Sequence, residues 1–129
     1  MCIRDRYNNN APVTLWGSGT PLREFLFVDD MAAAVVFALE NNLPDYLYNI
    51  GTGEDLTIKD LALLIQKIVG HNGEIIWDES KPDGTPRKLL DVSKMHALGW
   101  KHQINLEDGI QKTYDWFLEN INDYKELKM

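Results

Sequence analysis

The first half of the chain combines short runs of strand-forming residues with one long apolar run. Val13–Trp16 is β-prone and ends at the Gly- and Pro-containing turn 17–21, and residues 23–28 are again extended in character. The small and apolar residues of 31–39 favour a helix, and the aspartates at 29–30 are placed to cap its free N–H groups. Because this helix is apolar almost all round, the sequence predicts that it is deeply buried.

The next part predicts a strand followed by an amphipathic helix. Residues 46–50 alternate in a strand-like way and stop at the turn 51–53. Thr57 and Asp60 have the spacing of a helix cap, and Gly70 stands where a helix commonly ends. Between them, apolar residues recur at helical spacing: Leu61, Leu64, Ile65 and Ile68.

The last part predicts one more strand, a long loop and two helices. Residues 74–77 form a short strand, and the prolines, glycine and charges of 78–87 mark a loop. Ser93 is expected to cap a short helix that ends at about residue 98. Asn105 is expected to cap the final helix, in which apolar residues recur at helical spacing.

This order of elements describes a mixed α/β domain with a small sheet, and it does not describe a complete dinucleotide-binding fold. We expect the domain to cover residues 10–122. Residues 1–9 are expected to be a foreign or disordered leader, since the first six residues have no periodicity and look like translated adapter sequence. Residues 123–129 are charged and terminal, so we expect a frayed tail.

Composition narrows the class of protein further. The 129 residues, 44% of them hydrophobic, suit one domain with a modest core. The formal charge of -7 disfavours nucleic acid and anionic membranes as partners. Cys2 is the single cysteine, so neither a disulfide framework nor a zinc cluster is expected. Without an apolar run of roughly 20 residues, the sequence predicts no membrane span and favours a cytoplasmic protein.

The sequence contains no arrangement from which catalysis or metal binding can be argued. His71, His96 and His102 are scattered and lack a second ligand at a recognised spacing. The turn 51–53 follows a strand, but Glu54 and Asp55 come next and would repel a phosphate, so we interpret it as a plain turn. We therefore assign no catalytic, cofactor-binding or metal-binding residue in this chain.

Some residues suit a planar anionic ligand, although each also has an ordinary interpretation. The guanidinium of Arg23, just past a Gly- and Pro-containing loop, matches a diphosphate in charge and geometry, while most such arginines are solvated surface charges. Trp16 ends its strand, where core packing is the better expectation and contact with a base or sugar is the alternative. Loop 81–88 carries cations and the carboxylate of Asp83, and it also suits a simple solvated loop.

The loops together resemble the GDP-L-fucose synthase family of extended short-chain dehydrogenases/reductases. The resemblance covers about residues 10–120, and the narrowest part is the pair of loops Trp-Gly-Ser-Gly-Thr-Pro (16–21) and Lys-Pro-Asp-Gly-Thr-Pro-Arg-Lys (81–88). Residues 28–32, 48–53 and the Leu-Gly-Trp of 98–100 fit the same family. Phe27 is a departure, since relatives commonly have His or another polar or aromatic residue there.

The resemblance implies a carboxy-terminal, substrate-binding domain whose Rossmann half is missing. It implies that Trp16, Arg23 and Asp83, together with the neighbouring Lys88, hold a GDP-sugar. NADP would bind the upstream half of the full-length parent, which would also carry the Ser and Tyr-x-x-x-Lys of the redox step and the Cys and His of epimerisation. The family also tends towards homodimers. Cys2 and Tyr7 match none of these motifs.

Three interpretations follow. The first is part of an enzyme that in full length epimerises GDP-4-keto-6-deoxy-D-mannose at C3 and C5 and reduces it with NADPH to GDP-L-fucose, the part itself being inactive. The second is part of another nucleotide-sugar epimerase or dehydratase. The third is a non-catalytic module that binds a nucleotide sugar.

Overall fold

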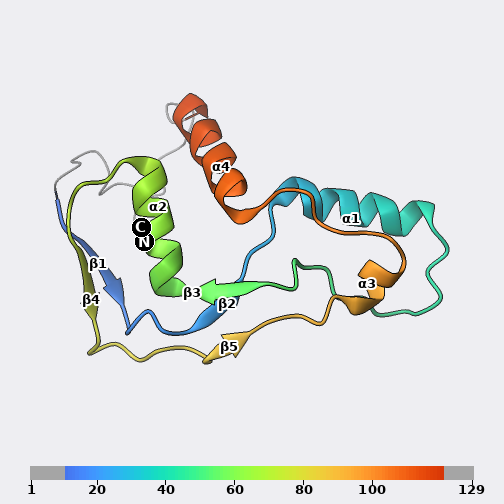
Figure 1. Ribbon diagram of the computed structural model, residues 1–129, viewed down its shortest axis with the longest axis horizontal. Coiled ribbons are helices and arrows are strands. Elements are labelled where there is room, and N and C mark those ends of the chain that lie inside the picture. Colours follow the sequence, from blue (N-terminus) through green and yellow to red (C-terminus); the bar gives the residue numbers. More distant parts are fainter. Residues whose placement is uncertain (1–10, 121–129) are drawn as a thin grey trace.

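The computed structural model describes residues 11–120, and Figure 1 shows an elongated molecule with the strands and α2 at one end and α1 and α3 at the other. The expected leader 1–9 and tail 123–129 lie outside the described residues. The elements are β1 (Val13–Trp16), β2 (Leu22–Glu24), α1 (Val28–Glu40), β3 (Asp55–Thr57), α2 (Ile58–Val69), β4 (Ile75–Asp78), β5 (Arg87–Lys88), α3 (Ser93–Ala97) and α4 (Leu106–Asn120).

The strands form two small sheets, which confirms the expected mixed α/β class. β1 pairs with β4 in parallel, and β2 lies between antiparallel β3 and parallel β5. β3 was not expected from the sequence, which places a loop there. It forms because Leu22, Arg23 and Glu24 of β2 offer an edge that residues 55–57 can pair with.

The local helix signals of the sequence are confirmed at α2 and α4. The Thr57 hydroxyl accepts a hydrogen bond from the Asp60 N–H at 3.0 Å, and Gly70 ends α2 in the left-handed conformation with φ 67°. At α4, the side-chain oxygen of Asn105 accepts from the Asp108 N–H at 2.9 Å. Each signal depends on residues within one helical turn, so sequence alone was enough to place it.

Helix α1 differs from the prediction at its start. It begins at Val28, so the expected strand 23–28 ends early at Glu24, and Phe27 occupies the N-cap position without a side-chain cap. The aspartate cap was therefore a wrong prediction. Asp30 instead turns inward, where it is 5% exposed and accepts hydrogen bonds from the backbone N–H groups of Gln103 and Ile104, each at 3.0 Å. The carboxylate joins α1 to the segment that leads into α4.

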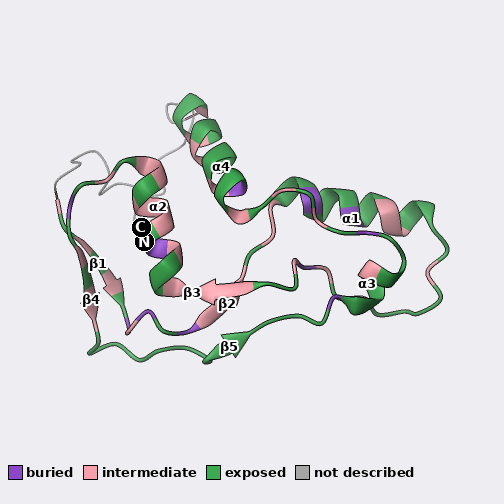
Figure 2. Ribbon diagram, in the orientation of Figure 1, coloured by how far each residue is buried: buried purple, intermediate pink, exposed green. Residues whose placement is uncertain are grey.

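The prediction that α1 is deeply buried was also wrong. Ala34 is fully buried and Asp30 nearly so, while much of the helix surface is exposed (Figure 2). Val28, Met31, Val35 and Leu39 recur at the spacing of one helical face and are between 41% and 81% exposed. The described residues supply packing partners for one side of α1 alone, so its other apolar side faces outward.

Two further local predictions were wrong. Residues 46–50 form no strand, because no described strand lies beside them to complete a ladder. Two of their side chains form hydrogen bonds instead: the Tyr48 hydroxyl accepts from the Asp45 N–H at 2.9 Å, and the Asn49 amide donates to the Asp91 carbonyl at 3.1 Å. Ser93 does not cap α3: the cap position is Val92, and the Ser93 N–H donates to the Asp91 carboxylate at 3.0 Å.

The described core is small and lies between α1 and α3. Ala34, Met95 and Trp100 are its buried members. Partly buried apolar side chains pack around it: Leu26, Phe37, Tyr48 and Ile50. Because so few side chains are fully buried, distant segments are connected largely by hydrogen bonds that the carboxylates of Glu24 and Asp30 accept from backbone N–H groups.

We predict that Asp30→Ala lowers the free energy of unfolding by about 2–4 kcal/mol, because it leaves the N–H groups of Gln103 and Ile104 without their charged acceptor. Asp29→Ala is the control, since Asp29 is exposed on the same turn. Urea unfolding measures both. Equal losses in the two variants, or unchanged amide exchange at residues 103 and 104 in Asp30→Ala, would contradict the assignment.

Candidate functional site

The two polar loops that the sequence singled out lie side by side because two segments of the chain run in parallel. β1 pairs with β4, and further along β2 pairs with β5 in the same direction. Loop 17–21 and loop 79–86 therefore begin together and end together. At the start, the Gly17 N–H donates to the Asp78 carbonyl at 2.9 Å, and at the end, the Leu22 N–H donates to the Pro86 carbonyl at 2.8 Å.

Asp83 connects the two loops at their middle. Its Oδ1 accepts from the Ser18 N–H at 2.9 Å, and its Oδ2 accepts from the Ser18 hydroxyl at 2.6 Å. These bonds, the hydroxyl bond first, hold the pKa of Asp83 below its ordinary value. Gly17 has φ 84°, and a Cβ there would overlap the Asp83 carboxylate. Glycine is thus required both by the turn and by the approach of the second loop.

Arg23 and Lys88 form a pair of neighbouring cations. They are opposite each other in the register of β2 and β5, so both side chains leave the sheet on the same face. Within residues 11–120 neither forms an ion pair. One guanidinium nitrogen of Arg23 donates to the Leu22 carbonyl at 2.6 Å. Gly84 lies against the other, since a Cβ at Gly84 would come within 3.2 Å of Arg23 Nη2.

The opposite face of the same sheet carries a neutralised pair. Arg87 donates to both carboxylate oxygens of Asp55, with Nε–Oδ2 and Nη2–Oδ1 distances of 2.5 and 3.1 Å. The Arg87 bond is the largest cause of the lowered pKa of Asp55. Because Arg87 is occupied in this way, the cations available to an anionic ligand on this sheet are Arg23 and Lys88.

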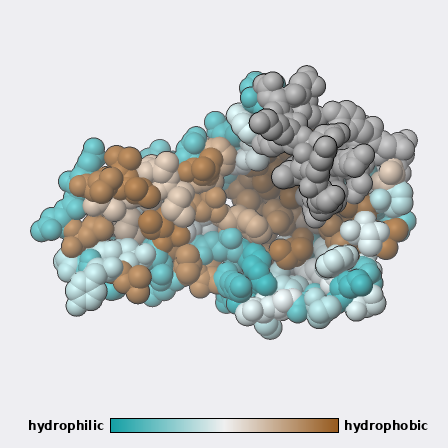
Figure 3. Space-filling model, turned by 180° about the vertical axis from the view of Figure 1, so that it is seen from behind, coloured by the Kyte–Doolittle hydropathy of each residue, from teal (hydrophilic) through white to brown (hydrophobic). Residues whose placement is uncertain are grey.

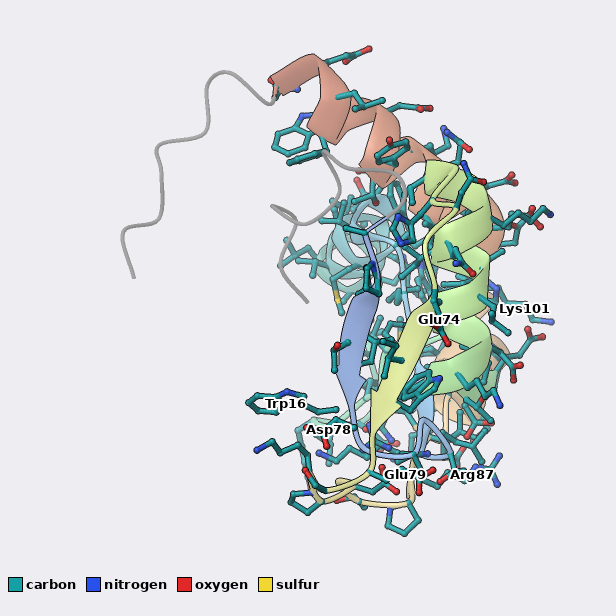
Figure 4. All side chains as sticks on the ribbon, turned by 90° about the vertical axis from the view of Figure 1, so that its left-hand side faces the viewer. Trp16, Glu74, Asp78, Glu79, Arg87 and Lys101 are labelled. Carbon is teal, nitrogen blue, oxygen red and sulfur yellow. The ribbon has the colours of Figure 1, made fainter. Side chains whose placement is uncertain are left out.

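Trp16 is not a core residue, contrary to the expectation from its spacing. Its side chain is 74% exposed at the end of β1, and Lys81 Nζ lies 5.5 Å from the ring centroid. Figure 4 shows Trp16 projecting outward beside Asp78, and Arg87 lies at the same end of the molecule on the opposite side. Of the four expected site residues, Arg23 and Lys88 are ladder partners, Asp83 precedes the Gly84 that lies against the Arg23 guanidinium, and Trp16 lies at the end of the other sheet.

Sequence reasoning missed Glu24, which fills the turn 51–53. Its Oε1 accepts from the Gly53 N–H at 2.7 Å, and its Oε2 accepts from the Leu90 N–H at 3.0 Å. A Cβ at Gly51 would overlap the same carboxylate. A negative group of the protein therefore occupies the place that a phosphate would need, which agrees with the interpretation of 51–53 as a plain turn. Sequence spacing could not reveal this contact, because its partners are far apart along the chain.

No group of three or more His, Cys, Asp or Glu side chains within residues 11–120 has the arrangement of a metal site. Over the same residues, no helix has both the length and the apolar content that crossing a bilayer requires. The arrangement offers cations, an exposed indole and an anchored carboxylate, and these groups can bind and orient an anionic ligand.

Comparisons with known proteins fit this arrangement. A family model described as the NAD dependent epimerase/dehydratase family matches residues 2–51. GDP-L-fucose synthase of Escherichia coli K12 is 55% identical over 126 aligned residues, covering 90% of this chain and 39% of that protein. Putative GDP-L-fucose synthase 2 of Arabidopsis thaliana is 50% identical over 119 residues, covering 92% of this chain and 36% of the relative. The chain thus spans between a third and two fifths of the length of these relatives.

The fold of this chain also matches that of a solved relative. The GDP-L-fucose synthetase of Naegleria fowleri bound to NADP superposes with a TM-score of 0.80 at 28% identity, over 86% of this chain and 36% of that one. Fold and sequence thus show similarity to part of the nucleotide-sugar enzymes described by the NAD dependent epimerase/dehydratase model, which matches residues 2–51. Among these enzymes, the chain is a homologue of the GDP-L-fucose synthases.

We predict that Ser18→Ala raises the pKa of Asp83 towards 3.8, because it removes the hydroxyl bond that favours the charged form. Since the folded pKa is lowered, this contribution to stability is present above the ordinary aspartate pKa and is lost as the pH falls through the lowered value. Carboxyl carbon shifts followed by NMR against pH measure it. Ser80→Ala is the control, because Ser80 bonds Asp78 in the same way. The prediction would be refuted if Ser80→Ala raised the pKa of Asp83 and Ser18→Ala did not.

Proposed function

We propose that this chain is the carboxy-terminal, nucleotide-sugar-binding part of a GDP-L-fucose synthase. The complete enzyme would epimerise GDP-4-keto-6-deoxy-D-mannose at C3 and C5 and reduce the product with NADPH. The observation that carries the proposal is the presence of two cations, Arg23 and Lys88, on one face of the β2–β5 ladder beside the loop that Asp83 anchors, with no ion pair to either within residues 11–120. The 55% identity to the E. coli enzyme supports the same substrate class.

The cation pair suits a diphosphate for a simple electrostatic reason. Two adjacent phosphates carry charge that one cation does not neutralise, and a guanidinium can donate to two oxygens at once. Lys88 supplies a second charge at the neighbouring position, opposite Arg23 in the ladder. Strand pairing fixes the backbone positions of the two cations, and the Leu22 carbonyl holds the Arg23 guanidinium, so less side-chain entropy is lost at Arg23 when the ligand arrives.

Trp16 and Asp83 complete the proposed binding surface. The exposed indole of Trp16 can stack against a base or sugar, with Lys81 beside its ring. Each Asp83 oxygen accepts one hydrogen bond from Ser18 and retains a free lone pair that could accept from a ligand hydroxyl. In this proposal the described residues bind and orient the substrate, and none of them transfers a proton or hydride.

The proposal places cofactor binding in the part of the enzyme that this chain does not cover. NADPH would supply the hydride there. Two solved relatives carry NADP, the N. fowleri synthetase and the GDP-mannoheptose C4 reductase of Campylobacter jejuni. Within the described residues, the turn 51–53 does not fit a cofactor phosphate, because the Glu24 carboxylate already accepts the Gly53 N–H.

The exposed apolar side of α1 supports the proposal that the other half of the enzyme packs against it. Brown apolar surface gathers at the α1 end of the molecule in Figure 3. The exposed apolar side chains of α1 include Val35, Val36 and Leu39. Residues 46–50, which have the pattern of a strand, run close to the same end of the molecule (Figure 1), and no described strand pairs with them. A larger half that covers α1 and pairs with 46–50 would bury this apolar surface and complete the backbone hydrogen bonds.

A second candidate is a reductase of another GDP-sugar. The C. jejuni GDP-mannoheptose C4 reductase is 41% identical, with a TM-score of 0.74, and this chain covers 35% of it. Both candidates share a GDP group, so the cation pair serves either. The sugar that supports NADPH consumption by the complete enzyme separates them.

We predict that Arg23→Ala in the complete enzyme weakens binding of the GDP-sugar by roughly 10- to 150-fold, the effect of losing a charge-assisted contact of about 1.5–3 kcal/mol. The turnover number should change much less, because Arg23 makes no proton or hydride transfer. Calorimetry with GDP and steady-state kinetics measure these two effects. Lys101→Ala, an exposed cation away from the sheet, is the control. An unchanged affinity for GDP in Arg23→Ala would reject the site.

We predict that the purified chain alone does not oxidise NADPH with GDP-4-keto-6-deoxy-D-mannose. Co-expression with the portion of the E. coli relative that this chain does not cover should restore oxidation. Leu39→Asp should prevent that restoration by placing a charge on the apolar side of α1, whereas Asn42→Asp, just beyond the helix, should not. Oxidation by the chain alone, or full activity with Leu39→Asp, would contradict the proposal.

A further inference from the structure

Loop 79–86 is long and exposed, yet one contact fixes its middle. Every residue from 79 to 86 is exposed. Strand pairing holds the loop at its ends, through Asp78 and Arg87. Between these ends, the described hydrogen bonds that join it to loop 17–21 are those from the N–H and hydroxyl of Ser18 to Asp83. Without them, the middle of the loop would be free to move away from the first loop.

This contact also determines what lies beside the Arg23 guanidinium. Gly84 follows Asp83 directly, and its Cα is close enough to Arg23 that a Cβ would come within 3.2 Å of Nη2. The other terminal nitrogen donates to the Leu22 carbonyl at 2.6 Å. The guanidinium is therefore held between its own strand and the backbone at Gly84. A shift of the loop at Asp83 would therefore move the Gly84 backbone relative to the Arg23 guanidinium.

Ser18 itself is held in place. Its hydroxyl lies 2.7 Å from the Thr20 hydroxyl and 3.2 Å from the Thr20 N–H, within a turn flanked by Gly17 and Gly19 at positive φ. A Cβ at Gly19 would overlap the Trp77 ring, so the turn is seated against β4. A rigid turn is what a residue needs if it is to fix the position of a longer loop.

We propose that Ser18 is a positioning residue for the diphosphate of the nucleotide sugar. It acts through Asp83: by fixing that carboxylate, Ser18 sets Gly84 against Arg23 and so orients the guanidinium that meets the phosphates. The inference rests on the proposed function, since it assigns a role to Ser18 in the same site. Ser18 needs no contact with the ligand to have this effect.

The test uses the complete enzyme and compares Ser18→Thr with Ser18→Val, two side chains of nearly equal shape that differ in the hydroxyl. Ser18→Val is expected to weaken GDP binding about tenfold relative to Ser18→Thr, with the turnover number changed by less than about twofold. Guanosine, which has no phosphate, should bind both variants equally. Ser80→Ala, which removes a matched serine–aspartate bond in the same loop, should leave GDP affinity unchanged.

A double-mutant comparison shows whether Ser18 acts through Arg23. In an Arg23→Ala background, Ser18→Val should weaken GDP binding no further than Ser18→Thr, because the group that it positions is absent. Asp83→Asn should lose less affinity than Asp83→Ala, since the amide can still accept from the Ser18 N–H and donate to its oxygen. Thermal melts establish that each variant is folded at the temperature of the assay.

The outcomes separate the inference from the proposed function. An unchanged GDP affinity in Arg23→Ala overturns the site as a whole. A weakened Arg23→Ala together with equal GDP affinities in Ser18→Thr and Ser18→Val overturns the positioning role alone. Equal losses for GDP and guanosine, or an undiminished Ser18 effect without Arg23, would also overturn it, because either result describes a general loosening of the fold.

Discussion

Parallel pairing of two segments distant in sequence is the constraint on which this structure depends. β1 with β4 and β2 with β5 run in the same direction, and the two intervening loops are forced to lie together. The second loop is longer, so it cannot follow the first residue by residue and must be pinned between its ends. Asp83 fixes the middle of the second loop by accepting two hydrogen bonds from Ser18. The cations of the proposed site then follow from register, since Arg23 and Lys88 are ladder partners.

Carboxylates that accept hydrogen bonds connect distant segments of the chain, which a larger apolar core would otherwise hold together. Glu24 accepts backbone N–H groups from Gly53 and Leu90, and Asp30 accepts them from Gln103 and Ile104. Each side chain satisfies donors in segments that have no strand to pair with. Charge-assisted bonds are stronger than neutral ones, so a few of them can join loops across a fold whose buried apolar cluster is small. Their strength depends on the carboxylates remaining ionised.

The sequence predicted features that depend on residues close together along the chain and missed those that depend on residues far apart along it. The Thr57 and Asn105 caps and the Gly70 stop each involve residues one turn apart, and all are present. Residues 46–50 have a strand pattern but lack a neighbouring strand among the described residues. The apolar run of α1 led to a prediction of burial, whereas most of the helix is exposed. Ser18 and Glu24 left no signal, because their importance lies in partners brought close by strand pairing.

The acidic balance of the chain and the cationic site are compatible because charge acts over a limited range. The formal charge of -7 belongs to the whole chain, and some of its carboxylates are offset by a neighbouring cation, as Asp55 is by Arg87. Salt screens exposed charges beyond roughly 8 Å at physiological ionic strength. A diphosphate at the β2–β5 face therefore responds mainly to Arg23 and Lys88. A long polyanion would extend past them and meet the excess of carboxylates in the rest of the chain, so the proposed nucleotide-sugar site is compatible with a charge balance that disfavours nucleic acid.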